Sequence, residues 1–178
     1  MLLDALGQTA GLTTCKLEAV PDSTEGTNLD ALWITDDGVT TLCEVKLSEA
    51  EFGTAKDDLE HNDKLASIYL PILTGHVDST LLKAPEFFEA YQILRNVWHL
   101  CNLHKKQETG RLIFLLPKAN TFLDKELARV LAMVTNPVIR ASIFVFYIEN
   151  VLESLIKDPS CPLDLRMHTK EMKVKYVI

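Results

Sequence analysis

The sequence has no long hydrophobic run, no closely spaced cysteine pair and no secretory start. None of its apolar stretches, within 178 residues, reaches the roughly 18–20 residues that cross a bilayer. The first residues, Met1 to Asp4, lack the basic region and cleavage pattern of a signal peptide. The four cysteines lie far apart, which argues against a CxxC zinc knuckle and a disulfide framework. We therefore expect free thiols, a cytoplasmic protein and no membrane partner.

The sequence also lacks internal repeats, low-complexity linkers and a glycine-rich phosphate loop. A chain of 178 residues without such a linker is most simply one domain, spanning residues 1–178. Basic residues are in the minority, since 18 Lys and Arg stand against 25 Asp and Glu, for a net charge of −7. This balance argues against a protein that wraps nucleic acid, although a bound metal or a local cluster of cations can still attract it.

The most informative stretch, from Asn28 to Ser48, predicts a β-hairpin. Residues 29–35 and 40–47 are rich in β-forming side chains, and a turn sequence ending in Gly38 separates them. Glycine adopts the positive φ that such a turn needs. A three-residue loop sets Asp30 opposite Glu44, whereas a two-residue loop would slip the register and move Asp30 to the other face. We take the three-residue loop as the working choice.

In this register Asp30, Glu44 and Lys46 share one face of the hairpin. Like charges directly opposite one another destabilise a sheet, and burial increases the cost. A divalent cation removes this conflict, because hard ions such as Mg²⁺ bind carboxylate oxygens and keep several waters. The alternative is an exposed hairpin whose charges are solvated.

Asp30 followed by Glu44-Val45-Lys46 resembles the PD-(D/E)xK motif of restriction-endonuclease-like nucleases, with Leu29 in place of the proline. The resemblance implies that Asp30, Glu44 and the Val45 carbonyl hold Mg²⁺ or Mn²⁺, and that Lys46 orients or activates the attacking water. The implied activity is hydrolysis of DNA, as a Mg²⁺-dependent endodeoxyribonuclease. The segment after Lys46 is similar to that of some members, which makes Glu49 an accessory candidate.

A helix that begins near Pro85 carries two different faces. Its apolar stripe suits packing on a sheet, and its polar stripe contains Gln92, Arg95, Asn96 and His99. Gln92 and Arg95 suit phosphate or water, so they are possible accessory residues of the site. For Asn96 and His99 an exposed helix surface is the simpler interpretation.

The order of elements predicts an α/β fold. We expect a strand at 13–20, then the hairpin and helices, and buried strands at 111–117 and 139–148 that are joined by a helical crossover. The tail, residues 171–178, is expected to add a strand or an interface. The resemblance covers the order of elements from Leu12 to Ile148 and implies a restriction-endonuclease-like three-layer sandwich with a central mixed β-sheet flanked by helices.

Three functional hypotheses remain open at this point. The first is the metal-dependent nuclease with DNA as substrate, in which a homodimer would cut both strands. The second is a fold relative that no longer cuts and serves as an interaction module, which the acidic charge balance favours. The third is an unrelated α/β protein with a charged hairpin.

Overall fold

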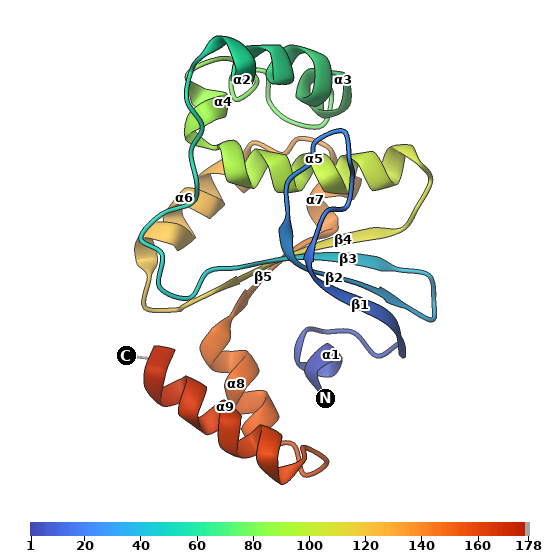
Figure 1. Cartoon of the computed structure of the whole chain (residues 1–178), viewed down its shortest axis with the longest axis vertical. Helices are drawn as coiled ribbons and strands as arrows, with labels where there is room; N and C mark the ends of the chain where they lie inside the picture. Colours follow the sequence, from blue (N-terminus) through green and yellow to red (C-terminus); the bar gives the residue numbers. More distant parts are fainter. Residues whose placement is uncertain (177–178) are drawn as a thin grey trace.

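The fold is built around a five-stranded mixed sheet in the strand order β1-β2-β3-β4-β5 (Figure 1). The structure is a computed structural model that describes residues 1–176. The pairs β1–β2 and β2–β3 are antiparallel, and the pairs β3–β4 and β4–β5 are parallel. The strands are β1 (Leu12–Ala19), β2 (Leu29–Thr35), β3 (Thr40–Val45), β4 (Gly110–Leu116) and β5 (Ile143–Tyr147).

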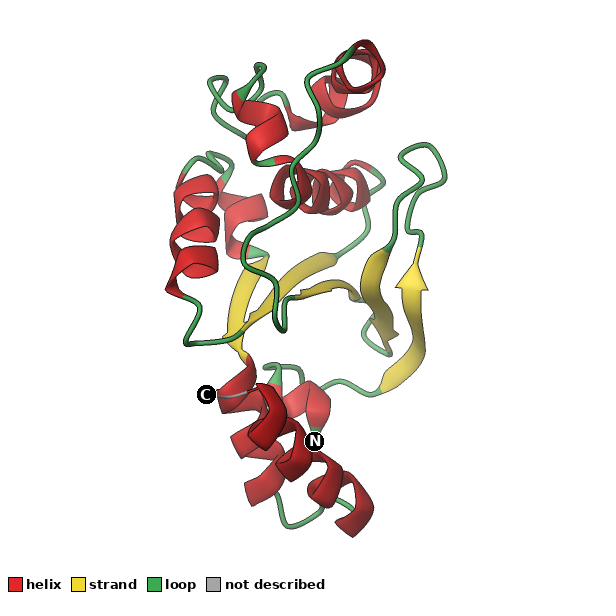
Figure 2. Ribbon diagram, turned by 60° about the vertical axis from the view of Figure 1, so that its left-hand side comes forward, coloured by secondary structure: helices red, strands yellow, loops and turns green. Residues whose placement is uncertain are grey.

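Helices cover both faces of this sheet, so the molecule has three layers (Figure 2). One layer contains α2 (Leu59–Lys64), a π-helical turn (Leu65–Tyr69), α3 (Leu70–Leu73), α4 (Glu86–Glu89), α5 (Tyr91–Lys105), α6 (Thr121–Ala132) and α7 (Pro137–Ala141). The opposite layer contains α1 (Leu2–Ala5), α8 (Ile148–Lys157) and α9 (Leu163–Tyr176). This is the α/β sandwich that the sequence predicts.

Each face of the sheet has its own buried core. Leu42 and Phe114 belong to the larger core under α5, and Trp33, Cys43 and Ile113 belong to the smaller core under α1 and α8. Neighbouring residues of β3 therefore serve different cores, because side chains alternate across a strand. Glu44 consequently faces the α5 side.

The hairpin has the predicted three-residue loop. Thr35 donates its backbone N–H to the Val39 carbonyl at 3.1 Å, and Gly38 adopts a φ of +79°. Ala31 pairs with Cys43, so the same register sets Asp30 opposite Glu44. The predicted register is confirmed, although β3 itself ends at Val45, two residues earlier than expected.

The second buried strand begins later than predicted. Residues 139–141 lie in α7, because Pro137 occupies its first turn and the Asn136 side chain accepts the N–H groups of Val138 and Ile139 at 2.9 and 3.1 Å. These are strong helix-start signals, and they outweigh the β-forming side chains that follow. Strand β5 starts at Ile143 and lies parallel to β4, so the predicted crossover is confirmed.

The C-terminal segment was expected to add a strand or an interface, and the strand is wrong for the described residues. Residues 171–176 continue α9 rather than forming a strand, and Lys173 donates to Glu153 of α8 at 2.9 Å. Residues 177 and 178 of the predicted tail lie outside the described part of the chain. Among the described residues, no helix has the length and apolar character that crossing a membrane requires.

Candidate active site

The candidate site lies where β2 begins and β3 ends, beneath α5. Asp30 stands near the start of β2, and Glu44 stands near the end of β3. Lys46 follows β3 directly and stays tied to the sheet, because its backbone N–H donates to the Leu115 carbonyl at 2.9 Å. The three residues of the predicted constellation are therefore brought together by the sheet.

Glu44 is almost completely buried, at 3% exposure, and every contact to its carboxylate comes from a donor. The amide groups of Gln92 and Asn96 donate at 2.6 and 3.1 Å. The Lys46 ammonium lies 3.3 Å from Glu44 Oε1, and the Arg95 guanidinium lies 3.8 Å from Oε2. These donors explain how a carboxylate is accommodated in the core of the protein.

Asp30 is bound to the strand that carries Glu44. Its Oδ2 accepts the Val45 backbone N–H at 2.6 Å, which fixes the carboxylate next to the Glu44 peptide. Burial raises the pKa of Glu44, and the negative charge of Asp30 raises this pKa further, while the Lys46 ammonium lowers it. The two carboxylates thus repel each other, and a cation bound between them would relieve that repulsion.

The donor set suits a hard divalent ion. The described residues contain no group of three or more His, Cys, Asp and Glu side chains that could hold a metal, so a zinc-type cage is absent from them. Two carboxylates and the Val45 carbonyl are oxygen ligands, and Mg²⁺ commonly takes one or two carboxylates and completes its shell with water. The residues therefore fit Mg²⁺ or Mn²⁺ better than a softer metal.

Lys46 is held between Glu44 and an aromatic ring. It is only 6% exposed, and its ammonium lies 5.6 Å from the centre of the Phe52 ring. Phe52 belongs to the segment between β3 and α2, which rises from the sheet past the beginning of α5 (Figure 1). Several hydrogen bonds hold the segment; among them, Gln92 accepts the Gly53 N–H at 2.7 Å and Glu126 accepts the Phe52 N–H at 3.2 Å.

The accessory candidates are arranged in different ways. Gln92 joins the loop at Gly53 to Glu44, and Arg95 also lies 3.5 Å from the Asn28 carbonyl. The Glu49 carboxylate instead accepts the N–H groups of Leu47 and Ser48 at 2.8 and 3.0 Å. Although burial opposes the effect, these backbone hydrogen bonds lower the pKa of Glu49. That Glu49 assists metal binding stays a prediction.

Two predictions about the polar stripe of α5 are wrong. Asn96 and His99 were expected on an exposed surface, but they are 0% and 2% exposed. Asn96 donates to Glu44, and His99 lies 3.4 Å from Glu25. Each of these polar side chains has a buried partner. A helical pattern in the sequence does not distinguish such a buried polar residue from one on the surface.

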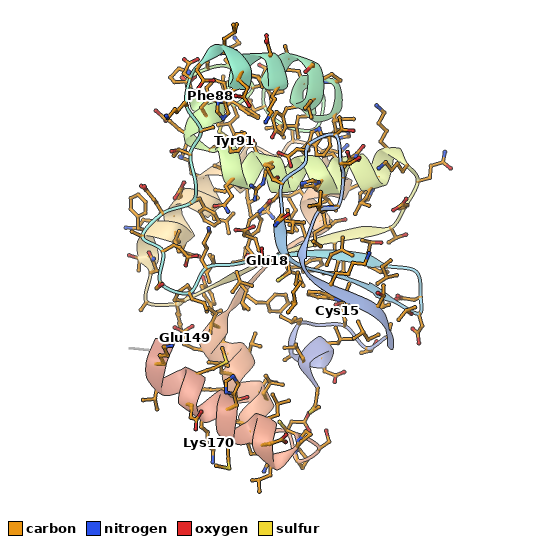
Figure 3. All side chains as sticks on the ribbon, in the orientation of Figure 1. Cys15, Glu18, Phe88, Tyr91, Glu149 and Lys170 are labelled. Atoms are coloured by element: carbon orange, nitrogen blue, oxygen red, sulfur yellow. The ribbon has the colours of Figure 1, made fainter. Side chains whose placement is uncertain are left out.

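Glu25 is a buried acid that sequence reasoning missed, because it lies in an apparently polar loop before β2. Its carboxylate also accepts the Tyr69 hydroxyl at 2.7 Å, and that hydroxyl lies 2.8 Å from the hydroxyl of Tyr91, which Figure 3 labels at the start of α5. Burial alone would raise the pKa of Glu25, but the nearby His99 ring and hydrogen bonds from Thr27 and Tyr69 lower it to about 2. The polar stripe of α5, which contains His99, is the feature of the sequence that could have indicated a buried acidic partner.

Glu18 extends the acidic side of the sheet. It lies on β1, where the pairing of Leu17 with Ala31 and of Ala19 with Leu29 sets it opposite Asp30 (Figure 3). Glu18 is exposed and adopts a φ of 49°, which interrupts the regular strand geometry. It therefore lies beside the buried pair without being one of its contacts.

A family model described as Restriction Endonuclease associating with ARP (REase-ARP) matches residues 7–177. The matched residues contain all five strands and the whole candidate site. Comparisons with curated proteins and with solved structures find no match. The mixed sheet flanked by helices agrees with a restriction-endonuclease-like fold. The chain therefore belongs to the restriction-endonuclease-like family that this model describes.

Proposed function

We propose that the protein is a metal-dependent nuclease that hydrolyses phosphodiester bonds of DNA, as an endodeoxyribonuclease with a PD-(D/E)xK-type site. The observation that carries the proposal is the buried Glu44 carboxylate, which has Asp30 on the neighbouring strand and the Lys46 ammonium 3.3 Å away. Family membership supports the same activity class. A buried carboxylate beside a second, half-buried carboxylate is costly unless a ligand uses the pair.

The proposed roles follow from the positions of the side chains. Asp30, Glu44 and the Val45 carbonyl would hold Mg²⁺ or Mn²⁺. When bound, such an ion stabilises charge on phosphate oxygens and lowers the pKa of a coordinated water. Lys46 would orient the attacking water or a phosphate oxygen, and Arg95 would supply a second cation beside it. Gln92 fixes the orientation of Glu44 through its amide donor.

Cleavage of supercoiled plasmid with Mg²⁺ or Mn²⁺ tests this proposal. We expect metal-dependent nicking by the wild type and a loss of at least 100-fold in Lys46→Ala, because one catalytic proton-transfer group typically contributes 10²–10⁴-fold. Lys16→Ala is the matched control, since Lys16 lies exposed on β1. Equal cleavage by Lys46→Ala and Lys16→Ala would contradict the role of Lys46.

A homodimer belongs to the same proposal. One site cuts one strand, so a second copy is the simplest way to cut a duplex completely. Sedimentation of the protein with a short duplex in EDTA distinguishes one copy from two.

A second candidate is an interaction module that does not cut DNA. Glu44 already receives hydrogen bonds from Gln92 and Asn96 and an ion pair from Lys46, so the fold can accommodate its charge without metal. The description of the family also names association with ARP, which suggests a protein partner. Absence of metal binding by the wild type would favour this candidate.

A further inference from the structure

Helix α6 presents an exposed aromatic side chain close to the candidate site. Phe122, in the first turn of α6, is 60% exposed, although large apolar side chains are usually buried. A hollow of about 380 Å³ opens on one side of it and a second, of about 390 Å³, on the other. We call the first of these the α6 hollow; Glu51, Phe52, Phe122, Lys125, Glu126 and Arg129 contribute to its lining.

The α6 hollow lies next to the candidate site, with the buried Phe52 between them. This residue contributes to the lining of the hollow, and its ring centre lies 5.6 Å from the Lys46 ammonium. The Glu126 carboxylate accepts the Phe52 N–H at 3.2 Å and thereby joins α6 to the loop. The hollow and the candidate site therefore border one another, and a DNA strand that reached Lys46 would pass beside the hollow.

Cations and acids in the hollow suit different parts of a nucleotide. Lys125 and Arg129 lie three and seven residues after Phe122, on one side of α6, and both side chains are exposed. Exposed cations of this kind bind phosphates. Three acids, Glu51, Glu89 and Glu126, also line the hollow and repel phosphates, but their oxygens accept hydrogen bonds from the amino groups of bases.

We propose that the α6 hollow receives an unpaired base of the DNA strand bound at the candidate site, with the base stacked on Phe122 and its phosphates on Lys125 and Arg129. The inference rests on the proposed nuclease function and names its substrate class, which is DNA with an unpaired or displaced nucleotide. An exposed ring beside two cations is the arrangement by which proteins bind unstacked bases. A fully paired duplex offers no base to the hollow.

Binding in EDTA tests the inference without cleavage. The probes are a paired duplex and the same duplex with a one-nucleotide bulge of 2-aminopurine, whose fluorescence falls when the base stacks. We expect the wild type to prefer the bulged duplex and to quench the probe. Phe122→Ala should weaken binding of the bulged duplex by about 5-fold or more and abolish the quenching, because one stacked base contributes roughly 1–3 kcal/mol.

Two variants separate stacking from loss of fold. Phe122→Trp should keep both the preference and the quenching, and Leu163→Ala, a control at a 72% exposed position of α9, should change neither. The double variant Lys125→Ala, Arg129→Ala should reduce the slope of log affinity against log salt by about 1.4–1.8.

The inference is overturned if the wild type binds both duplexes equally, or if Phe122→Ala weakens both to the same extent. In either case metal-dependent cleavage of plasmid leaves the proposed nuclease function standing. If the wild type neither binds DNA nor cuts it, the proposed function fails, and the inference fails with it.

Discussion

Glu25 is the clearest residue-scale example of a buried charge stabilised by its neighbours. Its pKa is lowered to about 2, so its ionised form is favoured by the fold relative to the unfolded chain. A carboxyl group with a depressed pKa contributes stability above its unfolded pKa, about 4.3, and this contribution is lost as the pH falls toward 2.

We therefore expect Glu25→Gln to lose on the order of 3 kcal/mol of unfolding free energy at pH 7, because the fold lowers the pKa of Glu25 from about 4.3 to about 2. The difference from the wild type should shrink between about pH 5 and pH 2. Denaturant unfolding at several pH values measures both. A constant difference across this range would show that the Glu25 charge does not contribute through its contacts.

The cysteines give a second prediction at the scale of single residues. Cys15 is exposed, whereas Cys43, Cys101 and Cys161 are buried. Burial raises the pKa of Cys43 and of Cys101 to about 12, which keeps both thiols protonated and unreactive at neutral pH.

A thiol-alkylating reagent should thus modify the native protein once, at Cys15, within minutes. In denaturant all four cysteines should react. Peptide mass spectrometry locates the modified residue, and rapid native labelling of Cys43 would contradict the packing of the smaller core.

At the scale of elements, the sequence predicted the hairpin better than it predicted the helix above it. Gly38 and the alternation of side chains specified the register of Asp30 and Glu44, because both are local signals. The partners of Asn96 and His99 lie far away in the chain, on β3 and in the loop before β2. A helical period gives the face of a side chain, but it does not show what covers that face.

The positive φ of Gly38 disfavours any residue other than glycine at this position. An added Cβ would meet nothing within 4 Å, so a substitution is opposed only by the φ of +79°. We expect Gly38→Ala to lower the unfolding free energy by about 1 kcal/mol, and Gly38→Asn to lower it less, because Asn tolerates left-handed backbone. Thermal unfolding of the two variants checks this order, and an unchanged Gly38→Ala protein would contradict the turn.

The loop between β3 and α2 depends on Glu126 for its position beside Lys46. Glu126→Ala removes the acceptor of the Phe52 N–H, whereas Glu126→Gln retains an oxygen there. Amide hydrogen exchange at Phe52 should become faster in Glu126→Ala by about 5-fold or more, since one hydrogen bond contributes about 1 kcal/mol, and should change little in Glu126→Gln. Equal exchange in the wild type and in Glu126→Ala would show that other contacts hold the loop.

Across the whole molecule, the order of elements along the chain and the parallel crossover agree with the prediction from sequence. The beginning of β5 differs from the prediction because the Asn136 cap starts a helix there. The C-terminal segment differs because it is helical and contacts α8 through Lys173 and Glu153. The net charge of −7 describes the chain as a whole, whereas Lys46 and Arg95 place positive charge at the candidate site. The two cations there offset the charges of Asp30 and Glu44, so the charge of the whole chain does not describe the charge at the site.

The most direct test of the account is calorimetric titration of Mn²⁺ and Mg²⁺ into the wild type, Asp30→Asn and a control, Asp36→Asn, whose carboxylate lies in the hairpin loop away from Glu44. We predict saturable binding by the wild type and the control and at least a tenfold weaker affinity for Asp30→Asn, because one of two carboxylate ligands is lost. Absence of metal binding by the wild type would contradict the proposed metal site and leave the interaction module as the better account.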